Sequence, residues 1–580
     1  MNDYTLVQLW NSPPETWRAC LNTMPKQILV IVLAFFAFVC IGCHHDEEGP
    51  KELLALPSLH ITMTSLQLDS IIEDQDNKVS AYAILYNTDG DTLFKGNLTH
   101  IKTRGNSTYK EKKKPFAIKF PKKQSFFGLD RSKSFVLLAN AYDESHVRNA
   151  IALDLARAMG IPAPRYAYLS LYINGVYKGL YQMTNKVDVG KNALDITNLD
   201  KLNEWVNPKP LDTYEWFGLG REKQVIQRKG VLLDNNPEDI TGGYLLDITG
   251  PPEYYGKSLS GFVSAAKDNI RIRSPKYASM QEVDYIAERY NEMESAVMAA
   301  DGCHPETGRY YTEYLDRESF VHYYLLNELL LNWDGGWASF MMYKDADTID
   351  PRFYAGPAWD FDKTLDNPRF SDDAQTNLYC NEIFVDESWE GVGSAHSGGL
   401  LHCLCQYKDF QQAVRDCWLK ELGPACHDYL TAHSFDSLAI LLSHEADRDN
   451  ELYENRHSKN YEASVNRAIT FLRDRIAFFD WYYASTEEEQ VMIIAEWISG
   501  KNRKFYYPLE EAIEVPCLED VWYNHDPVYE LYYAGTDSYV PNGTIFHSSQ
   551  KLELRKREPT KREMQMRRIR KKLKKIGLHF

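Results

Sequence analysis

Alternating apolar and polar residues predict strands in the first part of the chain. An apolar run at 80–86 is followed by the turn residues Asn87–Asp91, so a hairpin with the run 92–101 is predicted. The stretch Lys114–Phe120 also alternates, with its aromatic and aliphatic side chains on one face. We therefore expect a β-rich N-terminal lobe over residues 59–240.

A helix and a second hairpin are predicted within this lobe. Residues 145–159 have helical spacing, with Ser145 as the N-cap and Gly160 after the last turn. Further on, Asn174-Gly175 separates two strand-like runs. This dipeptide supplies the positive φ angles of a type I′ turn, so the two runs are expected to pair.

Helical spacing dominates the second half of the chain. It predicts amphipathic helices at 281–299, 318–331, 407–422, 434–445 and 461–482. Shorter extended segments are expected between them, at 242–246, 339–344 and 353–359. The pattern predicts an α+β fold, in which a mainly helical C-terminal lobe at 241–484 follows the β-rich lobe and a cleft lies between them.

Two segments after residue 484 depart from the helical pattern. Residues 485–549 contain short strand-like runs and are predicted to form a small appended module. Residues 550–580 are strongly basic and are predicted to be a tail. The tail is either solvated or a basic helix that touches anionic lipid, polysaccharide or nucleic acid.

The N-terminal segment carries a predicted export signal. An apolar run, Ile28–Ile41, follows Lys26 and is too short for a comfortable membrane span. It ends in Cys40-Ile41-Gly42-Cys43, which resembles a bacterial lipobox, although Cys40 stands where Leu or Val is usual. We expect residues 1–43 to be a signal peptide and Cys43 to be lipidated. An uncleaved anchor or an ordinary signal peptide is the alternative.

The residues around this signal refine the prediction. Met24 is a possible true start of the chain, because the segment before it is polar. Residues 44–58 are expected to be a flexible tether. Their acidic stretch, Asp46–Glu48, resembles surface-export signals of Bacteroidetes lipoproteins. We therefore expect an exported lipoprotein in the outer membrane or at the cell surface of a Bacteroidetes-like bacterium.

Composition supports a globular body of more than one domain. Hydrophobic residues make up 44% and charged residues 25% of the 580 residues. The net charge of -17 argues against nucleic acid as the main partner. The cysteines in a helical stretch are interpreted as core residues, of which one pair could form a disulfide: Cys403, Cys405, Cys417 and Cys426.

Two acidic motifs carry the candidate chemistry. Asp334 follows a predicted helix and precedes Gly335-Gly336, so it lies on a loop at a helix end. Asp360 and Asp362 are two residues apart, and in an extended segment both would point to one face and share a cation. Phosphoryl transfer needs such oxygen ligands for Mg²⁺ and an acceptor near the attacking hydroxyl. The alternative is that the acids cap a turn or pair with Lys363 or Arg369.

Several motifs together resemble the CotH kinase family (spore coat protein H-like kinases). Gly356-Pro-Ala-Trp-Asp-Phe-Asp362 is similar to the family's GPxWDxD signature. Further matching stretches lie in order along residues 59–483: Arg104–Ser107, Lys114–Lys119, His146–Asn149, Ile173–Tyr181, Gly242–Tyr244 and Ile272–Pro275. The resemblance implies an atypical bilobal kinase-like fold.

The resemblance also implies an activity and a site. Family members transfer phosphate from ATP, with Mg²⁺ or Mn²⁺, to protein hydroxyls, so we expect Ser/Thr phosphorylation of exported or cell-envelope proteins. By position, Asp334 would be the catalytic residue, and Asp360 and Asp362 would bind the metal. The remaining implied nucleotide-site residues are Arg104, Lys119, its competitor Lys114, Arg148 and Trp359. For Arg148 and Trp359, a purely structural role stays open.

One departure from the family pattern leaves a second hypothesis open. The family often has a Glu shortly before the Val-Asp that follows the second hairpin, whereas this chain has Thr184-Asn185-Lys186 there. Glu328 or Asp188 could substitute. If the Glu supports a phosphate-binding residue, its absence favours a catalytically inactive surface-binding or structural lipoprotein.

Overall fold

The N-terminal lobe folds into a closed β-barrel. Its strand order is β1-β2-β3-β4-β5-β7-β6, and parallel pairing of β1 with β6 closes it. The strands are β1 (Ser58–Thr62), β2 (Val79–Tyr86), β3 (Thr92–Thr103), β4 (Phe116–Gln124), β5 (Ser132–Leu138), β6 (Tyr166–Ile173) and β7 (Val176–Asn185). Both predicted hairpins are present, as β2–β3 and β6–β7.

The computed structural model describes residues 55–191, 194–222, 225–250, 252–332, 334–335, 338–367, 379–383, 399–432, 434–453, 460–496, 502–513, 528–557, 560–562 and 565. Cys43, the predicted signal peptide, Arg369 and most of the basic tail lie outside these residues. The described part contains three sheets and a set of helices, which confirms the α+β prediction.

The barrel interior is built from the predicted apolar face of β4. Phe116, Ile118 and Phe120 are buried in one core cluster, and Phe120 packs edge-on against Phe135. The helix α4 (Ser65–Glu73) was not predicted. It adds the buried Ile71 to this core. Its signal is the capping box that Thr64 forms with the residue three positions later.

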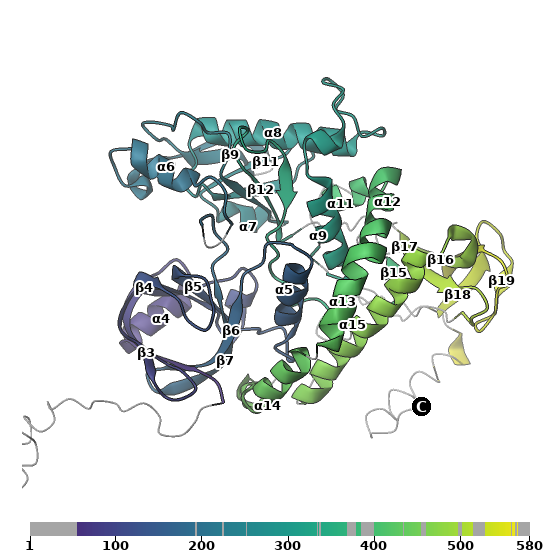
Figure 1. Ribbon diagram of the computed structural model, residues 1–580, viewed down its shortest axis with the longest axis horizontal. Helices are drawn as coiled ribbons and strands as arrows, with labels where there is room; N and C mark the ends of the chain where they lie inside the picture. The colour runs from purple at the N-terminus through teal and green to yellow at the C-terminus, as the bar shows by residue number, and fades with distance from the viewer. Residues whose placement is uncertain are drawn as a thin grey trace, which may run out of the picture. The chain divides into compact units, whose positions relative to one another are not determined.

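A second sheet carries strands from widely separated parts of the chain. Its order is β14-β13-β10-β12-β11-β9-β8. The strands are β8 (Trp216–Glu222), β9 (Val225–Val231), β10 (Tyr244–Ile248), β11 (Ser260–Val263), β12 (Asn269–Ser274), β13 (Phe340–Lys344) and β14 (Phe353–Ala355). The long helix α8 (Met280–Met298) runs along this sheet and contacts β9 and β11 (Figure 1).

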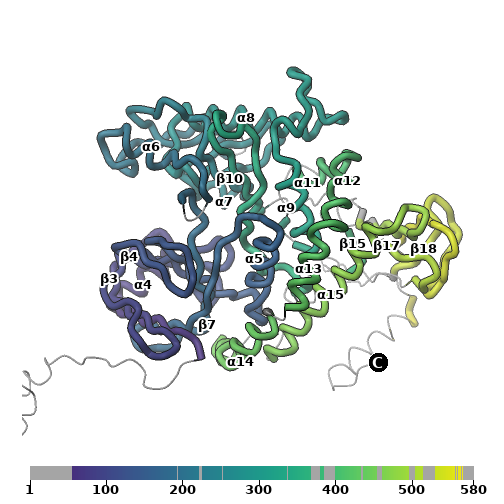
Figure 2. Tube along the Cα trace, in the orientation of Figure 1, coloured from purple at the N-terminus to yellow at the C-terminus, as the bar shows by residue number. Residues whose placement is uncertain are grey.

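The remaining described helices, except α7, contribute residues to one large apolar core. They are α5 (Arg148–Ala158), α6 (Leu199–Val206), α7 (Pro252–Gly256), α9 (Arg317–Leu329), α11 (Gly399–Leu404), α12 (Lys408–Cys417), α13 (Gly423–Thr431), α14 (Ser434–Tyr453) and α15 (Tyr461–Ala484). A π-helix (Trp418–Leu422) joins α12 to α13. Figure 2 shows α15 alongside α13, and the two helices are in contact.

The predicted core cysteines lie in this helical region. Cys405, Cys417 and Cys426 are buried, as expected, and Cys403 is half-buried. Every cysteine among the described residues is a free thiol, so the disulfide that the sequence left open does not form there.

A third sheet has its own small core and the order β15-β17-β16-β20-β18-β19. Its strands are β15 (Glu382–Ile383), β16 (Gln490–Glu496), β17 (Asn502–Pro508), β18 (Val528–Tyr533), β19 (Tyr539–Val540) and β20 (Gln550–Arg557). The first residues of the predicted basic tail therefore form strand β20. Within the described residues, each helix is too short or too polar to traverse a bilayer.

Candidate active site

Asp334 is held by a tight turn at the end of helix α9. The turn begins with Leu331, whose φ of 45° reverses the chain direction. The backbone amide of Asn332 then donates to the Asn327 carbonyl at 2.9 Å, and the Asn332 side-chain amide donates to Asn327 Oδ1 at 2.8 Å. Asn332 Oδ1 in turn accepts a hydrogen bond from the Asp334 amide at 3.1 Å. The helix end therefore fixes the backbone that carries Asp334.

The second acidic motif is a turn, not an extended segment. Strand β14 ends at Ala355, and Asp360 has a φ of 72°. The expectation that Asp360 and Asp362 share a face because the segment is extended was therefore wrong. Asp tolerates the left-handed region better than most residues, and such strained positions cluster at functional sites.

Hydrogen bonds from distant parts of the chain hold this turn. The Phe361 amide donates to Asn149 Oδ1 at 2.8 Å, and the Thr364 hydroxyl donates to the Phe361 carbonyl at 2.7 Å. The side-chain amide of Asn367 donates to the Asp362 carbonyl at 2.6 Å. The geometry of the turn is thus set by its own residues together with helix α5.

One backbone hydrogen bond ties the two acidic motifs to each other. The Leu365 amide donates to the Leu330 carbonyl at 3.0 Å, so the segment after Asp362 lies against the end of helix α9. All three acids line one cavity of about 480 Å³, a size that suits a nucleotide-sized ligand. The structure thus brings together Asp334, Asp360 and Asp362, while their chemical roles stay predictions.

The acids repel one another in a poorly solvated site. Burial and the charges of Asp360 and Asp334 hold the pKa of Asp362 well above its usual range, although Lys363 opposes them. Burial and Asp360 likewise raise the pKa of Asp334. Both side chains are only 7% exposed. A hard divalent cation such as Mg²⁺ fits this site, because it binds carboxylate oxygens. Its charge would also relieve the repulsion between the ionised acids.

Lys363 is the cation in direct contact with these acids. Its Nζ donates to Asp334 Oδ1 at 3.1 Å, and the acids raise the pKa of Lys363 despite its burial. The sequence left open that the acids pair with Lys363. This pairing is present in the structure, and its partner is Asp334. Asp360 contacts a different group, because its Oδ2 accepts from the Ser339 hydroxyl at 3.0 Å.

Three arginines, here called the arginine wall, also line the cavity: Arg104, Arg271 and Arg273. The guanidinium of Arg104 lies 5.4 Å from the centre of the Trp359 ring, and both line the cavity. Arg271 and Arg273 on strand β12 line it too and both pair with Asp247. Burial, with the charges of Arg273 and Arg271, lowers the pKa of Arg104 to about 10. Such a concentration of guanidinium groups suits phosphate oxygens.

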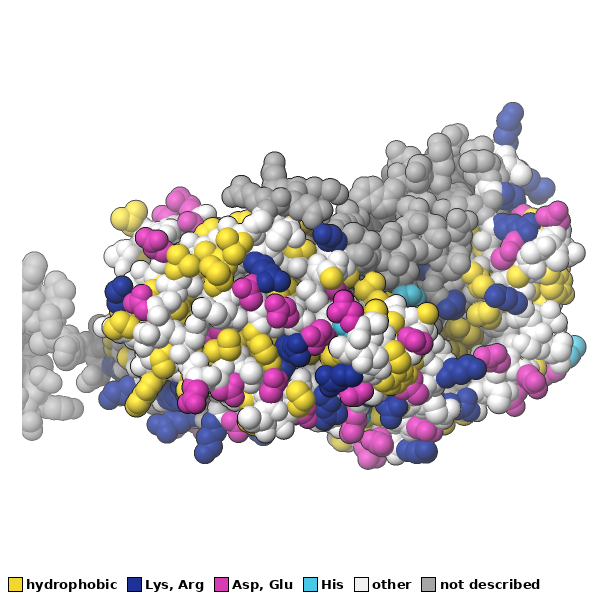
Figure 3. Space-filling model, turned by 90° about the horizontal axis from the view of Figure 1, so that it is seen from above, with side chains coloured by type: hydrophobic (Ala, Val, Ile, Leu, Met, Phe, Trp, Pro, Cys, Tyr) yellow, Lys and Arg dark blue, Asp and Glu magenta, His cyan; other side chains and the backbone are white. Residues whose placement is uncertain are grey.

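The two arginines on β12 were not predicted as site residues, although Arg273 lies in a motif that matched the family. Their sequence signal is the alternation Arg271-Ile272-Arg273, which places both on one strand face. The surface shown in Figure 3 differs from the cavity, because acidic and basic side chains of the described residues are intermingled on it.

Three of the predicted nucleotide-site residues do not line the cavity. Lys114 Nζ donates to the Tyr109 carbonyl at 2.7 Å, and Lys119 lies on strand β4 opposite His100. Arg148 is fully buried, where it pairs with Asp143 and donates from Nε to the Thr364 carbonyl at 3.0 Å. Arg148 therefore anchors the second acidic turn from behind.

Asn185, the residue at which the chain departs from the family pattern, lies away from the arginine wall. Asn185 exchanges two hydrogen bonds with the backbone of Asp130, at 2.9 and 2.8 Å. Glu328, one suggested substitute, is buried against Arg475 in the helical lobe. Asp188, the other, pairs with Lys186 at 3.0 Å, and its charge acts on Arg273. Of the two substitutes, only Asp188 has an electrostatic effect on the cavity wall.

Comparison with known proteins identifies the family. No curated protein matches the chain. The family model described as CotH kinase protein matches residues 101–479, which is more than half of the chain. The matched region begins in strand β3, ends in helix α15 and includes Asp334, Asp360, Asp362 and the three arginines of the cavity. The chain therefore belongs to the CotH kinase family.

Proposed function

We propose that this chain is a protein kinase that transfers the terminal phosphate of ATP to Ser or Thr hydroxyls. Membership of the CotH family implies ATP-dependent phosphotransfer with a divalent metal. The observation that carries the finer proposal is one cavity lined by Asp334, Asp360 and Asp362 together with Arg104, Arg271 and Arg273. This is the charge arrangement that a metal–triphosphate needs.

Asp360 and Asp362 would hold the cation. When bound, the cation neutralises charge on the phosphate oxygens. Mg²⁺ or Mn²⁺ fits because every candidate ligand is a carboxylate oxygen. Asn149 and Arg148 act behind these ligands, since they fix the backbone on either side of Asp362.

Arg104, Arg271 and Arg273 would bind the phosphate oxygens. Asp247 orients the two arginines on β12, and Trp359 lies beside Arg104. Because guanidinium groups stay charged even when buried, they bind phosphate at any physiological pH. Trp359 is 8% exposed and packs in a core cluster, although it also lines the cavity beside Arg104.

Asp334 would orient the attacking hydroxyl and accept its proton. In the transfer, the hydroxyl oxygen forms a bond to the terminal phosphorus, the bond to the bridging oxygen breaks, and ADP leaves. The hydroxyl proton passes to the Asp334 carboxylate. Lys363 favours the ionised form of Asp334, which opposes the effect of burial on its pKa.

The substrates we propose are exported or cell-envelope proteins. This part rests on the sequence: the predicted lipobox at Cys43 would anchor the chain to a membrane at the cell surface. The basic segment after residue 557 would then lie near anionic lipid or polysaccharide.

An inactive surface-binding protein is the second candidate, and Asn185 is the observation that favours it. Asn185 bonds to Asp130 and gives no support to the arginine wall. A catalytically silent family member would keep the fold and lose phosphate transfer.

The deciding experiment incubates the purified chain with labelled ATP, Mg²⁺ or Mn²⁺, and a generic protein acceptor. We expect label transfer by the wild type and none by Asp334→Asn or Asp362→Asn. Asp284→Asn is the matched control, because Asp284 pairs with Arg228 on the surface of α8. Absence of both transfer and metal-dependent ATP binding would support the inactive alternative.

A further inference from the structure

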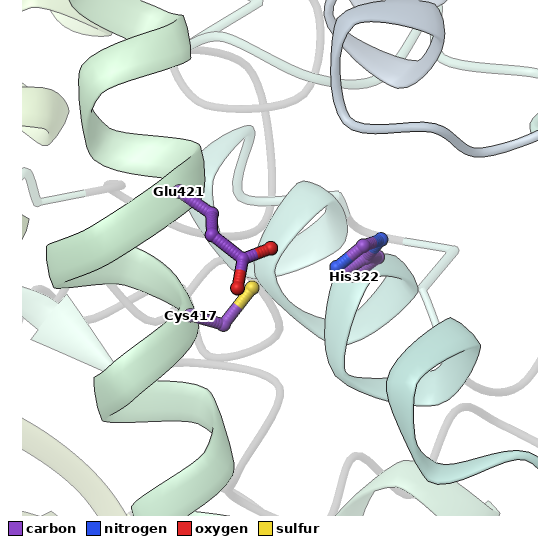
Figure 4. A group of neighbouring side chains, drawn as sticks. All are labelled: His322, Cys417 and Glu421. Atoms are coloured by element: carbon purple, nitrogen blue, oxygen red, sulfur yellow. The ribbon is translucent and has the colours of Figure 1, made fainter.

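Three metal-ligating side chains converge at a second place, between helix α9 and the π-helix. His322 comes from α9, while Cys417 ends α12 and Glu421 lies in the π-helix. One ligand atom from each, a ring nitrogen, the thiol sulfur and a carboxylate oxygen, lie within 4.8 Å of one another. Figure 4 shows the thiol and carboxylate on one helix and the imidazole on the facing helix. None of the three lines the acidic cavity.

The local backbone accounts for this convergence. Helix α12 packs against α9, which brings the two helix faces together. The widened turn at Trp418–Leu422 then carries Glu421 onto the same side as Cys417. π-helical turns of this kind are rare and are frequent at functional sites.

The imidazole has a ring nitrogen that is buried without a partner. His322 Nε2 is inaccessible to solvent, and no described residue gives it a hydrogen bond. Leaving such an atom unsatisfied is unfavourable. A metal ion bound by that nitrogen would satisfy it, and no hydrogen bond from a described residue does so.

We propose that His322, Cys417 and Glu421 form a zinc site, with a water molecule in the fourth position. Nitrogen, sulfur and oxygen ligands together are typical of tetrahedral Zn²⁺, with Zn–N of about 2.0 Å and Zn–S of about 2.3 Å. These lengths require ligand atoms about 3.5 Å apart. The exposed Glu421 side chain can close the remaining gap by rotating.

A zinc ion here would join helix α9 to the helical bundle. Helix α9 leads directly into the turn that carries Asp334. The site would therefore stabilise the support of the acidic cavity without touching its ligands. This inference does not depend on the proposed kinase activity.

Cobalt absorption tests the site, because Co²⁺ reports thiolate ligation and tetrahedral geometry directly. The purified, metal-free chain carries Asp362→Asn, so that the acidic cavity contributes little metal binding, and is titrated with Co²⁺ and then Zn²⁺. We expect one Co²⁺ per chain with a thiolate charge-transfer band, displaced by Zn²⁺. Zinc should also raise the melting temperature.

Variants identify the ligands. Cys417→Ser should abolish the charge-transfer band, and Glu421→Gln, an exposed change that leaves the fold intact, should weaken cobalt binding at least tenfold. Cys426→Ser, a buried free thiol on α13, is the matched control and should leave the band unchanged. The site is refuted if the parent shows no charge-transfer band, or if the band survives Cys417→Ser.

Discussion

The side-chain oxygen of Asn149 accepts a hydrogen bond from the Phe361 amide at 2.8 Å, between the two acids Asp360 and Asp362. Asn149 lies in the first turn of helix α5, more than 200 residues earlier in the chain. This contact fixes the backbone of the acidic turn from outside the cavity wall. Its loss should disturb the metal ligands more than the fold.

We therefore expect Asn149→Ala to weaken activation by Mg²⁺ roughly 10–100-fold, as is usual when a residue behind metal ligands is removed. The measurement is the Mg²⁺ dependence of phosphate transfer. Nucleotide affinity without metal should change little. An Asn149→Ala protein with normal Mg²⁺ dependence would show that the turn holds its shape without this bond.

Replacing Asp362 with Asn should stabilise the protein and at the same time abolish phosphate transfer. Burial and two neighbouring carboxylates hold the pKa of Asp362 well above its usual range, so its ionised form is unfavourable near neutral pH. One pKa unit corresponds to 1.36 kcal/mol, and we expect Asp362→Asn to raise the free energy of unfolding by about 1 kcal/mol or more. Urea unfolding at pH 7 without divalent metal measures this change.

The control for this prediction is Asp284→Asn on the surface, which should change stability by no more than about 0.5 kcal/mol. A marked loss of stability in Asp362→Asn would mean that the acid is favourably paired in the metal-free protein.

The effect of Mg²⁺ on stability should grow with pH. The pKa values of Asp334 and Asp362 are raised by burial and by nearby acids, so the folded protein binds more protons than the unfolded chain above pH 4 or so. Without metal, their contribution therefore lowers stability as pH rises from the ordinary Asp pKa toward the raised values. Mg²⁺ removes this penalty by binding the ionised forms.

Melting temperatures with and without Mg²⁺ between pH 5 and pH 8 test this dependence. The shift caused by Mg²⁺ should be larger at pH 8 than at pH 5. A shift that is constant or falls with pH would argue against carboxylate ligands.

The arginine wall should determine nucleotide affinity. Hydrogen bonds to charged groups contribute about 1.5–3 kcal/mol, so Arg104→Ala and Arg273→Ala should each weaken ATP binding by roughly tenfold or more. Lys114→Ala is the matched basic control, because its ammonium bonds to the Tyr109 carbonyl. Equal losses in the control and the arginine variants, measured by calorimetry, would contradict the assignment.

Local signals in the sequence were sufficient to predict individual elements. The Asn174-Gly175 turn, the apolar face of β4 and the helical spacing of α8 and α15 each predicted an element that is present. The acidic motifs were predicted as well, because clustered carboxylates are unfavourable unless a ligand compensates them.

Long-range relationships were harder to predict. In the second sheet, strand β10 pairs with the distant strand β13, so that Tyr244 lies opposite Lys344. Such pairings depend on the packing of the whole lobe and leave no local pattern. For the same reason, Arg148 could not be assigned between cavity and core, since its partners Thr364 and Leu365 are remote in sequence.

The most direct test is a crystal structure with Mn²⁺ and a non-hydrolysable ATP analogue. Anomalous scattering should place manganese between Asp360 and Asp362, with the triphosphate directed toward Arg104 and Arg273. Manganese bound elsewhere, or a nucleotide outside this cavity, would contradict the account.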